Sequence, residues 1–495
     1  MRRLIREPAS DRQSGDTMSP ITFPSHKTKI VCTIGPSSSS PSVMEQMIRA
    51  GMNIARLNFS HGSFESHRSV IQNLREVART LGRQITILVD LPGPKLRVGE
   101  LQTEPVELKA GEPFTLTSED VAGDPSRISV SFKKLPEVVR PGNMLFLNDG
   151  IIQLQVDKVE GHEVRSHVVV GGELRSRKGL NVPGIDLGVQ AFTEHDHELL
   201  KFALENGVDA VSQSFVESAA DIEAVRSAAY SLGHTPFIIA KIERARALEN
   251  IDSILTAAHG IMIARGDLGV EIPIEEIALT QKRIMRKANL LGRPVITATQ
   301  MLESMTTNRL PTRAEATDVA NAIIDGTDCV MLSGESAMGK FPVEAVSMLA
   351  RIASSTEPQL PHREVREAIR SIGRGIEVRP ADLISLSLES MLEHITPEVI
   401  VVPTRSGATA RNIARFKFPV WIAAISRESA TCQHLQFSYG TFSIHEPDLP
   451  DDWNLYTRNR LQERGVASGT AILIEGPSHR HPEANHRIEI LDLSR

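Results

Sequence analysis

The chain has 495 residues, of which 41% are hydrophobic and 23% charged, and its formal net charge at pH 7 is −6. This length exceeds what one hydrophobic core usually supports, so we expect two to four domains. Charges of both signs are interspersed without a basic stripe, which argues against nucleic acid or an anionic membrane surface as a partner.

The N-terminal segment and the cysteines bear on the cellular setting. Residues 1–24 mix arginines with acids and lack the apolar stretch of a signal peptide, so we predict a disordered leader, with a transit peptide as the alternative. The sequence has no run of about eighteen apolar residues that would span a membrane. Cys32, Cys329 and Cys432 have no paired spacing and fit reduced thiols. We therefore predict a cytoplasmic protein with no membrane partner.

From residue 29 onward, short β-branched runs alternate with segments of helical periodicity, the pattern of βα units around a parallel sheet. Eight such runs occur, at 29–34, 53–57, 85–91, 210–215, 237–242, 261–264, 295–298 and 329–332. Between 93 and 182 the alternation of strands and helices stops. Short strand-like runs separated by glycine turns such as Asn148-Asp149-Gly150 take its place. We predict an α/β protein whose (β/α)8 TIM barrel comprises 25–92 and 183–356, with an inserted all-β lid domain, a small β-barrel, at 93–182.

The sequence pattern changes again at Glu357-Pro358, where prolines and charged residues indicate a linker between two domains. Beyond it, strands expected at 399–402, 420–424, 471–474 and 488–491 alternate with helical segments. We therefore predict a C-terminal α/β domain over 365–495.

Polar residues stand at the ends of seven of the eight predicted barrel strands. In βα barrels the functional side chains gather there, because the βα loops build that face. The residues are Arg56, Asn58, Ser60, Asp90, Ser214, Lys241, Glu243, Arg265, Asp267, Thr299, Gln300, Ser333 and Glu335. Residues two apart on a strand point to the same face, so Lys241 can aim with Glu243.

The charges at the fifth and sixth strands have a chemical consequence. Burying an unpaired charge costs roughly several kcal/mol, so Lys241 requires an anion, and Glu243 with Asp267 requires a cation. Two carboxylates completed by phosphate oxygens and water suit Mg²⁺ or Mn²⁺. Placed positive charge together with a divalent ion is what phosphoryl transfer requires. A structural salt bridge at the barrel top is the alternative for any single pair.

Four stretches resemble the pyruvate kinase family, and the match runs from about Lys29 to Val346. They read NIARLNFSHG (53–62), IMIARGDLGVEIP (261–273), ATQMLESM (298–305) and PTRAEATDVANAIIDGTDCVMLSGE (311–335). The resemblance implies a glycolytic phosphotransferase that converts phosphoenolpyruvate and ADP into pyruvate and ATP. Members of this family are usually tetrameric, so it also implies a homotetramer.

The resemblance implies roles for individual residues. Arg56 would bind the substrate phosphate, Lys241 would stabilise the transferring phosphoryl group, and Thr299 would lie near the face where enolpyruvate is protonated. Glu243 and Asp267 would ligate Mg²⁺ or Mn²⁺. Further substrate contacts would come from Ser214, Gly266 and Asp267. The nucleotide site under the lid would comprise Arg97, Lys178, His61 and Asn58.

Two positions depart from the family pattern. Members that need K⁺ usually carry Glu at the place of Lys95, whose ammonium resembles a built-in substitute for the monovalent ion. We therefore predict a K⁺-independent enzyme; an exposed loop charge is the alternative for Lys95. The substitute region comprises Asn58, Ser60, Asp90, Leu91 and Lys95. The second departure is Glu217, where the family often has a basic residue and the sequence offers no explanation.

The segment Thr404-Arg405-Ser406-Gly407-Ala408-Thr409 resembles the effector-phosphate loop of allosteric members, with Thr404, Arg405, Ser406, Gly407 and Thr409 as candidate contacts. The alternative is an ordinary strand-to-helix turn capped by Ser406 or Thr409. The sequence leaves open which phosphorylated effector would bind. Two rival functions also stay open at this point, namely a catalytically silent barrel that binds sugar phosphates or nucleotides, and a Mg²⁺-dependent lyase or aldolase.

Overall fold

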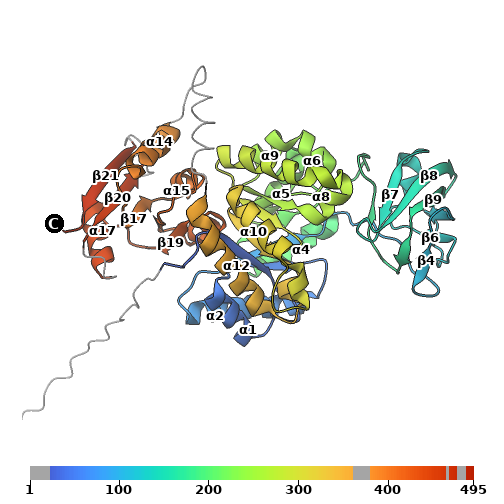
Figure 1. Ribbon diagram of the computed structural model, residues 1–495, viewed down its shortest axis with the longest axis horizontal. Helices are drawn as coiled ribbons and strands as arrows, with labels where there is room; N and C mark the ends of the chain where they lie inside the picture. The colour runs from blue at the N-terminus through green and yellow to red at the C-terminus, as the bar shows by residue number, and fades with distance from the viewer. Residues whose placement is uncertain (1–22, 361–379, 464–467, 477–485, 495) are drawn as a thin grey trace, which may run out of the picture.

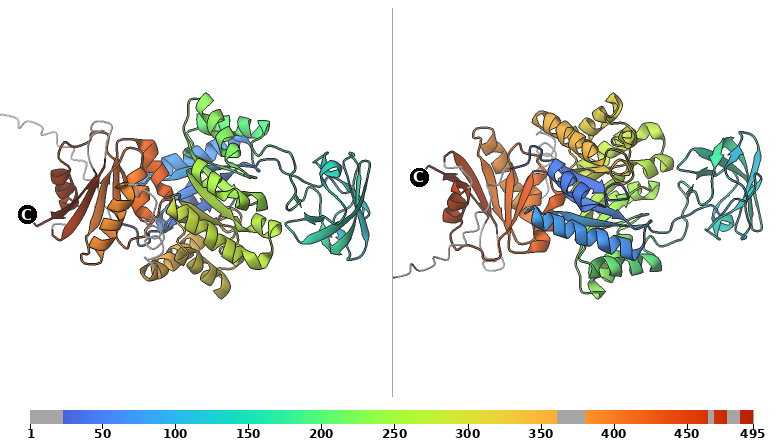
Figure 2. Two further views of the ribbon diagram at one scale, coloured as in Figure 1. Left: turned by 90° about the horizontal axis from the view of Figure 1, so that it is seen from above. Right: turned by 90° about the horizontal axis from the view of Figure 1, so that it is seen from below.

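A computed structural model describes residues 23–360, 380–463, 468–476 and 486–494. The predicted leader lies almost wholly outside this part of the chain. Three bodies follow one another along the long axis of the molecule, with the barrel in the middle, the inserted β-domain at one end and the C-terminal domain at the other (Figure 1). The views from above and below show the same order, and two chain segments join the β-domain to the barrel (Figure 2).

Eight parallel strands close into a barrel in the order β1-β16-β15-β14-β13-β12-β3-β2. Their bounds are β1 (Lys29–Thr33), β2 (Ile54–Asn58), β3 (Thr86–Leu91), β12 (Ala210–Gln213), β13 (Phe237–Ile242), β14 (Gly260–Ala264), β15 (Val295–Ala298) and β16 (Cys329–Leu332). The predicted eight-stranded barrel is thus confirmed.

Helices surround the barrel, and their ends follow local sequence signals. In α1, Ser40 accepts a hydrogen bond from the Val43 N–H, Pro41 is the first helical residue, and Gly51 ends the helix at φ 125°. The large outer helices are α1 (Pro41–Ala50), α2 (Phe64–Thr80), α4 (Glu194–Glu205), α5 (Ala219–Ser231), α7 (Ile251–Ala257), α9 (Ile277–Leu290), α10 (Arg313–Ile324) and α12 (Pro342–Thr356). Shorter helices lie in the loops between strand and helix, at α6 (Ala245–Glu249), α8 (Arg265–Glu271), η1 (Ile274–Glu276), η2 (Glu303–Thr306), α11 (Gly334–Ala337) and η3 (Glu357–Gln359).

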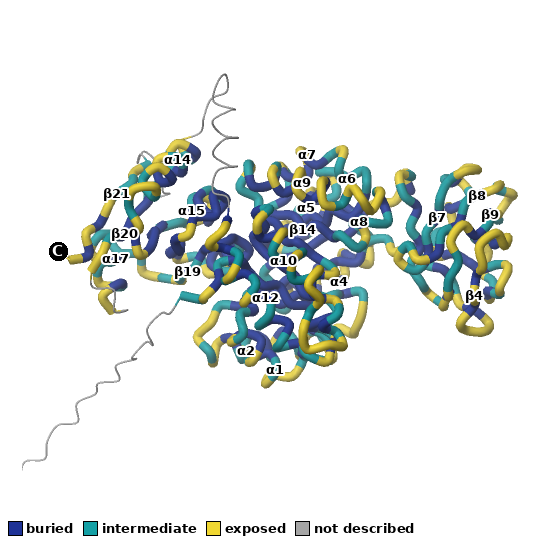
Figure 3. The backbone as a smooth tube through the Cα atoms, viewed as in Figure 1, coloured by how far each residue is buried: buried dark blue, intermediate teal, exposed yellow. Residues whose placement is uncertain are grey.

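The barrel has two apolar layers, one between strands and helices and one inside the ring of strands. The barrel strands are buried along their length, as the dark tube at the centre of Figure 3 shows. Inside the ring, Phe237, Met262 and Met331 pack with Phe437 from the C-terminal domain. The opposite end of the ring is left for polar residues.

The inserted domain has its own apolar core, built around residues such as Phe114, Leu145 and Leu154. A six-stranded sheet has the order β11-β7-β8-β9-β5-β6, and a second sheet pairs β10 with β4. The elements are β4 (Val106–Leu108), β5 (Pro113–Thr117), β6 (Arg127–Ser129), α3 (Leu135–Val138), β7 (Met144–Leu147), β8 (Ile152–Glu160), β9 (Glu163–Val170), β10 (Gly172–Leu174) and β11 (Leu180–Asn181). The predicted turn at Asn148-Asp149-Gly150 joins β7 to β8 with all three residues at positive φ.

The C-terminal domain is a five-stranded sheet in the order β19-β18-β17-β20-β21, in which β21 is antiparallel. Its elements are α14 (Pro380–Leu392), β17 (Val399–Pro403), α15 (Ala408–Ala414), β18 (Ile422–Ser426), α16 (Ser429–His434), η4 (Leu435–Phe437), β19 (Thr441–His445), α17 (Trp453–Gln462), β20 (Thr470–Glu475) and β21 (Arg487–Asp492). The strand β19 lies outside the four strands predicted for this domain. Its half-buried pattern with polar Thr441, Ser443 and His445 lacks the apolar run of its neighbours. None of the described helices is long and apolar enough to cross a bilayer.

Candidate active site

The barrel end that faces the inserted domain carries a buried guanidinium–carboxylate pair. Arg56, at the end of β2, donates from Nη2 to Asp90 Oδ2 on β3 and from Nη1 to Thr33 Oγ1 on β1 at 2.9 Å. Ser212 on β12 donates to the other carboxylate oxygen of Asp90 at 2.8 Å. Four neighbouring strands therefore hold Arg56 and Asp90 in one orientation.

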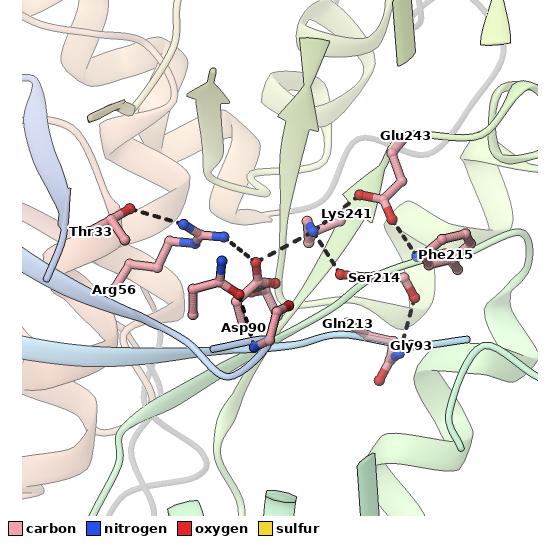
Figure 4. Close-up of polar contacts among 12 residues, drawn as sticks. Thr33, Arg56, Asp90, Gly93, Gln213, Ser214, Phe215, Lys241 and Glu243 are labelled. Atoms are coloured by element: carbon pink, nitrogen blue, oxygen red, sulfur yellow. Dashed lines mark hydrogen bonds and ion pairs between the residues drawn. The ribbon is translucent and has the colours of Figure 1, made fainter. Parts of the chain in front are cut away.

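Lys241, near the end of β13, completes this charge network. Its amine donates to Ser214 Oγ at 2.6 Å and lies 3.1 Å from Glu243 Oε2 and 3.4 Å from Asp90 Oδ2. Figure 4 shows the amine between these three groups, with Arg56 on the far side of Asp90. The strand ends thus bring two cations and two carboxylates into one buried cluster, as the alternation along β13 predicts.

The cluster perturbs the pKa values of its members. Burial favours the neutral amine of Lys241, but Asp90 and Glu243 outweigh that effect and raise its pKa above the usual value. Burial likewise favours the protonated form of Asp90, yet Lys241 and Arg56 outweigh it and lower the pKa of Asp90 to about 2. At neutral pH, Lys241 is charged and so is Asp90.

Glu243 and Asp267 are the carboxylates that fit a divalent cation. The Phe215 N–H donates to Glu243 Oε1 at 2.7 Å, whereas buried Oε2 accepts no hydrogen bond and faces only the Lys241 ammonium. Burial raises the pKa of Glu243 to about 6, and the charge of Asp267 on α8 contributes in the same direction. An unsatisfied carboxylate oxygen beside a second negative charge fits a hard cation such as Mg²⁺. Within the described residues, no group of three or more acid, His or Cys side chains forms an all-protein cage, so substrate and water oxygens would complete the coordination.

Backbone strain marks the ends of β12 and β15. Thr299 has φ 70° and Gln300 φ 53°, a conformation that is uncommon for any residue other than glycine and especially so for the β-branched Thr299. Thr299 Oγ1 accepts a hydrogen bond from the Gly266 N–H at 2.8 Å. Phe215, at φ 60°, is the residue whose N–H fixes Glu243. Such strain persists where surrounding contacts enforce it, and it clusters at functional sites.

Lys95 lies at the rim of the same cluster. The residue is exposed, yet its amine donates to Ser60 Oγ, and burial of the amine together with Lys241 and Arg97 lowers its pKa. Ser60 N–H in turn donates to Asn58 Oδ1 at 3.1 Å. The ammonium of Lys95 is therefore held close to the site, as the ion-substitute interpretation requires.

The lid-borne candidates lie along the stem of the inserted domain. Arg97 pairs with Gly179 through a β-bridge, and the Val98 N–H donates to the Lys178 carbonyl at 2.9 Å. Arg97 also donates to the Arg177 carbonyl at 2.8 Å. These contacts place Arg97 and Lys178 on neighbouring chain segments where the chain enters and leaves the inserted domain.

Two family models match this chain, the pyruvate kinase barrel domain over residues 25–346 and the pyruvate kinase alpha/beta domain over 382–483. The chain belongs to the pyruvate kinase family. It is accordingly a phosphotransferase enzyme of glycolysis with a TIM-barrel catalytic domain.

Relatives of known name agree with this assignment. A pyruvate kinase of Thermococcus litoralis is 49% identical over 475 residues, which cover 92% of this chain and all of that protein. A Geobacillus stearothermophilus pyruvate kinase is 43% identical and aligns with 86% of this chain and 72% of its own length. A crystal structure of a pyruvate kinase from Cryptosporidium parvum superposes with a TM-score of 0.87 at 34% identity, covering 95% of this chain and 96% of that one.

Some polar residues predicted at strand ends form hydrogen bonds that hold neighbouring loops of the barrel in place. Arg265 donates to Asp318 at 2.8 Å and to the Thr299 carbonyl at 2.8 Å, which supports the strained turn. Glu335 is fully buried and accepts from the N–H groups of Leu302 and Ser333 at 3.0 and 2.7 Å. His61, predicted for the nucleotide site, is exposed, and its carbonyl accepts a hydrogen bond from His67 Nε2 at 2.8 Å.

The candidate effector loop forms a compact turn. Thr404 Oγ1 accepts from the Gly407 N–H at 3.0 Å, Gly407 has φ 78°, and Arg411 donates to the Ser406 carbonyl at 2.9 Å. Gly407 precedes the first residue of α15, and neither Ser406 nor Thr409 supplies a side-chain cap. Capping by Ser406 or Thr409 is therefore wrong, although the segment is a turn between β17 and α15, and the effector interpretation stays a prediction.

Sequence reasoning missed Thr33, Ser212 and the backbone of Phe215. The two hydroxyls sit inside apolar strands, where threonine and serine also occur as simple core residues. Thr33 lies directly opposite Arg56 on the adjacent strand, and Ser212 lies directly opposite Asp90, so their contacts follow from strand pairing rather than from local sequence. Glu217, for which sequence offered no explanation, lies 3.4 Å from Arg244 and 3.3 Å from Arg246.

Proposed function

We propose that this chain transfers the phosphoryl group of phosphoenolpyruvate to ADP, with a proton consumed and pyruvate and ATP released. The observation that carries the proposal is the buried Lys241 ammonium between Asp90, Glu243 and Ser214, with Arg56 beside it. Placed positive charge of this kind stabilises a migrating phosphoryl group more strongly than it would in water.

Each residue has a distinct task in this reaction. Arg56 binds the substrate phosphate, and Lys241 compensates the charge of the phosphoryl group as its bond to the enol oxygen breaks and a bond to the ADP β-phosphate oxygen forms. Ser214 orients the Lys241 amine. Gly266 and Thr299 hold the carboxylate end, and Thr299 lies at the face where carbon 3 of the enolate takes up a proton.

Glu243 and Asp267 would hold Mg²⁺ or Mn²⁺, which supplies further positive charge to the phosphate and carboxylate oxygens of the substrate. The unsatisfied Oε2 of Glu243 supports this assignment. On the nucleotide side, Arg97, Lys178, His61 and Asn58 contact the phosphates and the base, and the lid excludes water when it closes.

We further propose that the enzyme works without K⁺. The support is the Lys95 ammonium, which donates to Ser60 at the rim of the cluster. Its charge takes the place of a monovalent cation among Asn58, Ser60, Asp90 and Leu91. Three buried, unpaired cysteines accord with a cytoplasmic setting.

A homotetramer is the proposed assembly. Ile274, Leu279 and Met338 expose 74%, 71% and 76% of their surface on the later βα units of the barrel, and a partner subunit would cover such side chains. The loop at Thr404 to Thr409 is proposed to bind a phosphorylated effector. Sedimentation velocity on the purified chain checks the assembly, since a monomer at micromolar concentration would contradict it.

The deciding experiment measures pyruvate formed from phosphoenolpyruvate with and without ADP and with and without Mg²⁺. We expect product only when both are present, with ATP formed in equal amount. Pyruvate that appears at the same rate without ADP would identify a lyase or phosphatase instead. Binding of both substrates without turnover would identify a silent regulatory barrel.

A further inference from the structure

The segment by which the chain returns from the lid to the barrel runs beside a cluster of ion pairs. Residues 183–186 follow the last lid strand, β11. Arg244 Nη2 donates to the Ile185 carbonyl at 3.4 Å, and Arg246 Nη1 lies 2.6 Å from Asp186 Oδ2. Both arginines follow directly after β13. This part of the barrel therefore contacts the returning linker at two successive residues, Ile185 and Asp186.

Arg244 is buried and has two carboxylate partners. Its side chain is 4% exposed and lies 3.4 Å from Glu271 Oε1 and 3.4 Å from Glu217 Oε1. Glu271 is itself buried and accepts from the Ala245 N–H at 3.3 Å. A buried pair of this kind is costly to break from one side, because the remaining charge stays in a low-dielectric surrounding. Arg244 and Glu271 therefore form a persistent anchor.

The outer part of the cluster is exposed and correspondingly weak. Arg246 and Asp186 expose 37% and 67% of their side chains, and Glu217 reaches both Arg244 and Arg246. Exposed ion pairs contribute little to stability and exchange readily with water. The linker thus contacts a buried, carboxylate-flanked arginine at Ile185 and a solvent-exposed one at Asp186, so we expect the contact with Arg246 to open more readily than the position of Arg244 changes.

The same short segment also carries a metal-site carboxylate. Arg244 follows Glu243, and its guanidinium lies 5.9 Å from the ring centroid of Phe215, whose N–H fixes Glu243. Figure 4 shows Phe215 and Glu243 facing one another at this edge of the cluster. One segment therefore contacts the reacting centre through Glu243 and the lid linker through Arg244.

We propose that Arg244 is a positioning residue that anchors the lid's return linker and thereby sets the lid-borne nucleotide contacts relative to Lys241 and Glu243. The inference rests on the proposed function, because the nucleotide is assigned there to Arg97 and Lys178. Glu217 and Glu271 orient the Arg244 guanidinium, which gives Glu217 a role in this chain. The pair between Arg246 and Asp186 opens and closes as the lid moves.

The kinetic test uses Arg244→Lys, which keeps the charge but loses the planar group that reaches the linker, Glu217 and Glu271 together. We expect the KM for ADP to rise about ten-fold, with the affinity for phosphoenolpyruvate in the absence of ADP changed by less than about two-fold. The matched control is Arg415→Lys, an equally buried arginine paired with Asp382 in the C-terminal domain, which should leave both values unchanged. Equal losses toward both substrates, or an unchanged KM for ADP, would overturn the proposal.

A second measurement does not depend on turnover. Hydrogen–deuterium exchange of residues 183–188 should be faster in Asp186→Asn and Arg244→Lys than in the wild-type chain, and unchanged in Asp252→Asn, an exposed aspartate paired with Lys287 elsewhere on the barrel. Asp186→Asn alters an exposed side chain and keeps the test valid if Arg244→Lys fails to fold. Unchanged exchange in both variants would refute the anchor. Absence of ADP-dependent activity in the wild type would instead refute the proposed function.

Discussion

The ammonium of Lys241 and the carboxylate of Asp90 lie 3.4 Å apart, with 11% and 4% of their side chains exposed. Asp90 also accepts from Arg56, so this one carboxylate contacts both cations of the cluster. A dianionic phosphate that enters beside Arg56 and Lys241 would meet donors whose charge and direction are already fixed. Such preorganisation costs no reorganisation during the reaction.

Lys241→Met should remove the cation closest to the transferring group. We expect kcat to fall by about 10²- to 10³-fold with a modest change in the KM for phosphoenolpyruvate, since the interaction strengthens in the transition state. Steady-state kinetics at saturating ADP and Mg²⁺ measure this. Lys417→Met is the control, because Lys417 is a buried lysine paired with Asp328 at the opposite end of the barrel and should lose stability but not kcat. A comparable kcat loss in both variants would assign Lys241 a structural role.

Asp90→Asn should affect stability and substrate binding together. Removal of the shared carboxylate takes away the ion-pair partner of buried Arg56 and leaves Lys241 paired with Glu243 alone, at a cost of about 3–5 kcal/mol by analogy with broken buried pairs. We expect a lower melting temperature in calorimetry and a raised KM for phosphoenolpyruvate, because Arg56 loses its orientation. Asp209→Asn, which breaks the pair with Arg75 before β12, should lower the melting temperature without changing that KM. If Asp90→Asn behaves like Asp209→Asn, then Asp90 has no part in substrate binding.

Particular residues show how far the sequence determines the site. Lys241 and Glu243 were predictable because charged residues two apart at the end of an apolar strand have no packing reason to be there. The barrel followed from eight apolar runs separated by helical periodicity. By contrast, the strand Thr441–His445 was missed because its alternating polar residues resemble a loop.

Contacts between neighbouring barrel strands could not be predicted from the local sequence. Thr33 reaches Arg56 only because β1 pairs with β2, and Ser212 reaches Asp90 because β12 pairs with β3 across a long insertion. The pairing of Glu217 with Arg244 joins two βα loops that are 27 residues apart in the chain, and no spacing rule relates them. Sequence therefore identifies charged strand ends more readily than the neutral donors that orient them.

Lys95→Glu should convert a K⁺-independent enzyme into a K⁺-dependent one. The substitution removes the ammonium held by Ser60 and adds a carboxylate able to bind a monovalent cation. At constant ionic strength, we expect wild-type activity to change by less than about two-fold when tetramethylammonium chloride is replaced by KCl, whereas the variant should require KCl. Lys134→Glu, at an exposed lid lysine, is the charge-matched control and should respond like the wild type. Strong KCl activation of the wild type would contradict the proposal.

His259 should make the fold sensitive to mild acid. Its Nδ1 accepts from the Ile238 N–H at 2.9 Å and its ring stacks on Phe237, with centroids 5.1 Å apart. Burial, together with Arg226 and His434, lowers the pKa of His259 to about 3 from an ordinary 6.5. The folded chain therefore keeps this imidazole neutral while the unfolded chain protonates it below pH 6.5. Stability is unaffected above that pH and falls as the pH drops from 6.5 toward 3.

The melting temperature of the wild type should accordingly decrease between pH 7 and pH 5, and His259→Asn should reduce the slope. His434, whose pKa burial and Arg411 lower to about 4, contributes in the same direction and leaves part of the slope in the single variant. His195→Gln, at an exposed histidine in the first turn of α4, is the control and should keep the wild-type slope. Differential scanning calorimetry at matched ionic strength measures the three slopes. His259→Asn removes the proton that His259 takes up on unfolding, whereas His195→Gln leaves that uptake in place. Equal slopes in the two variants would therefore mean that the acid sensitivity comes from groups other than His259.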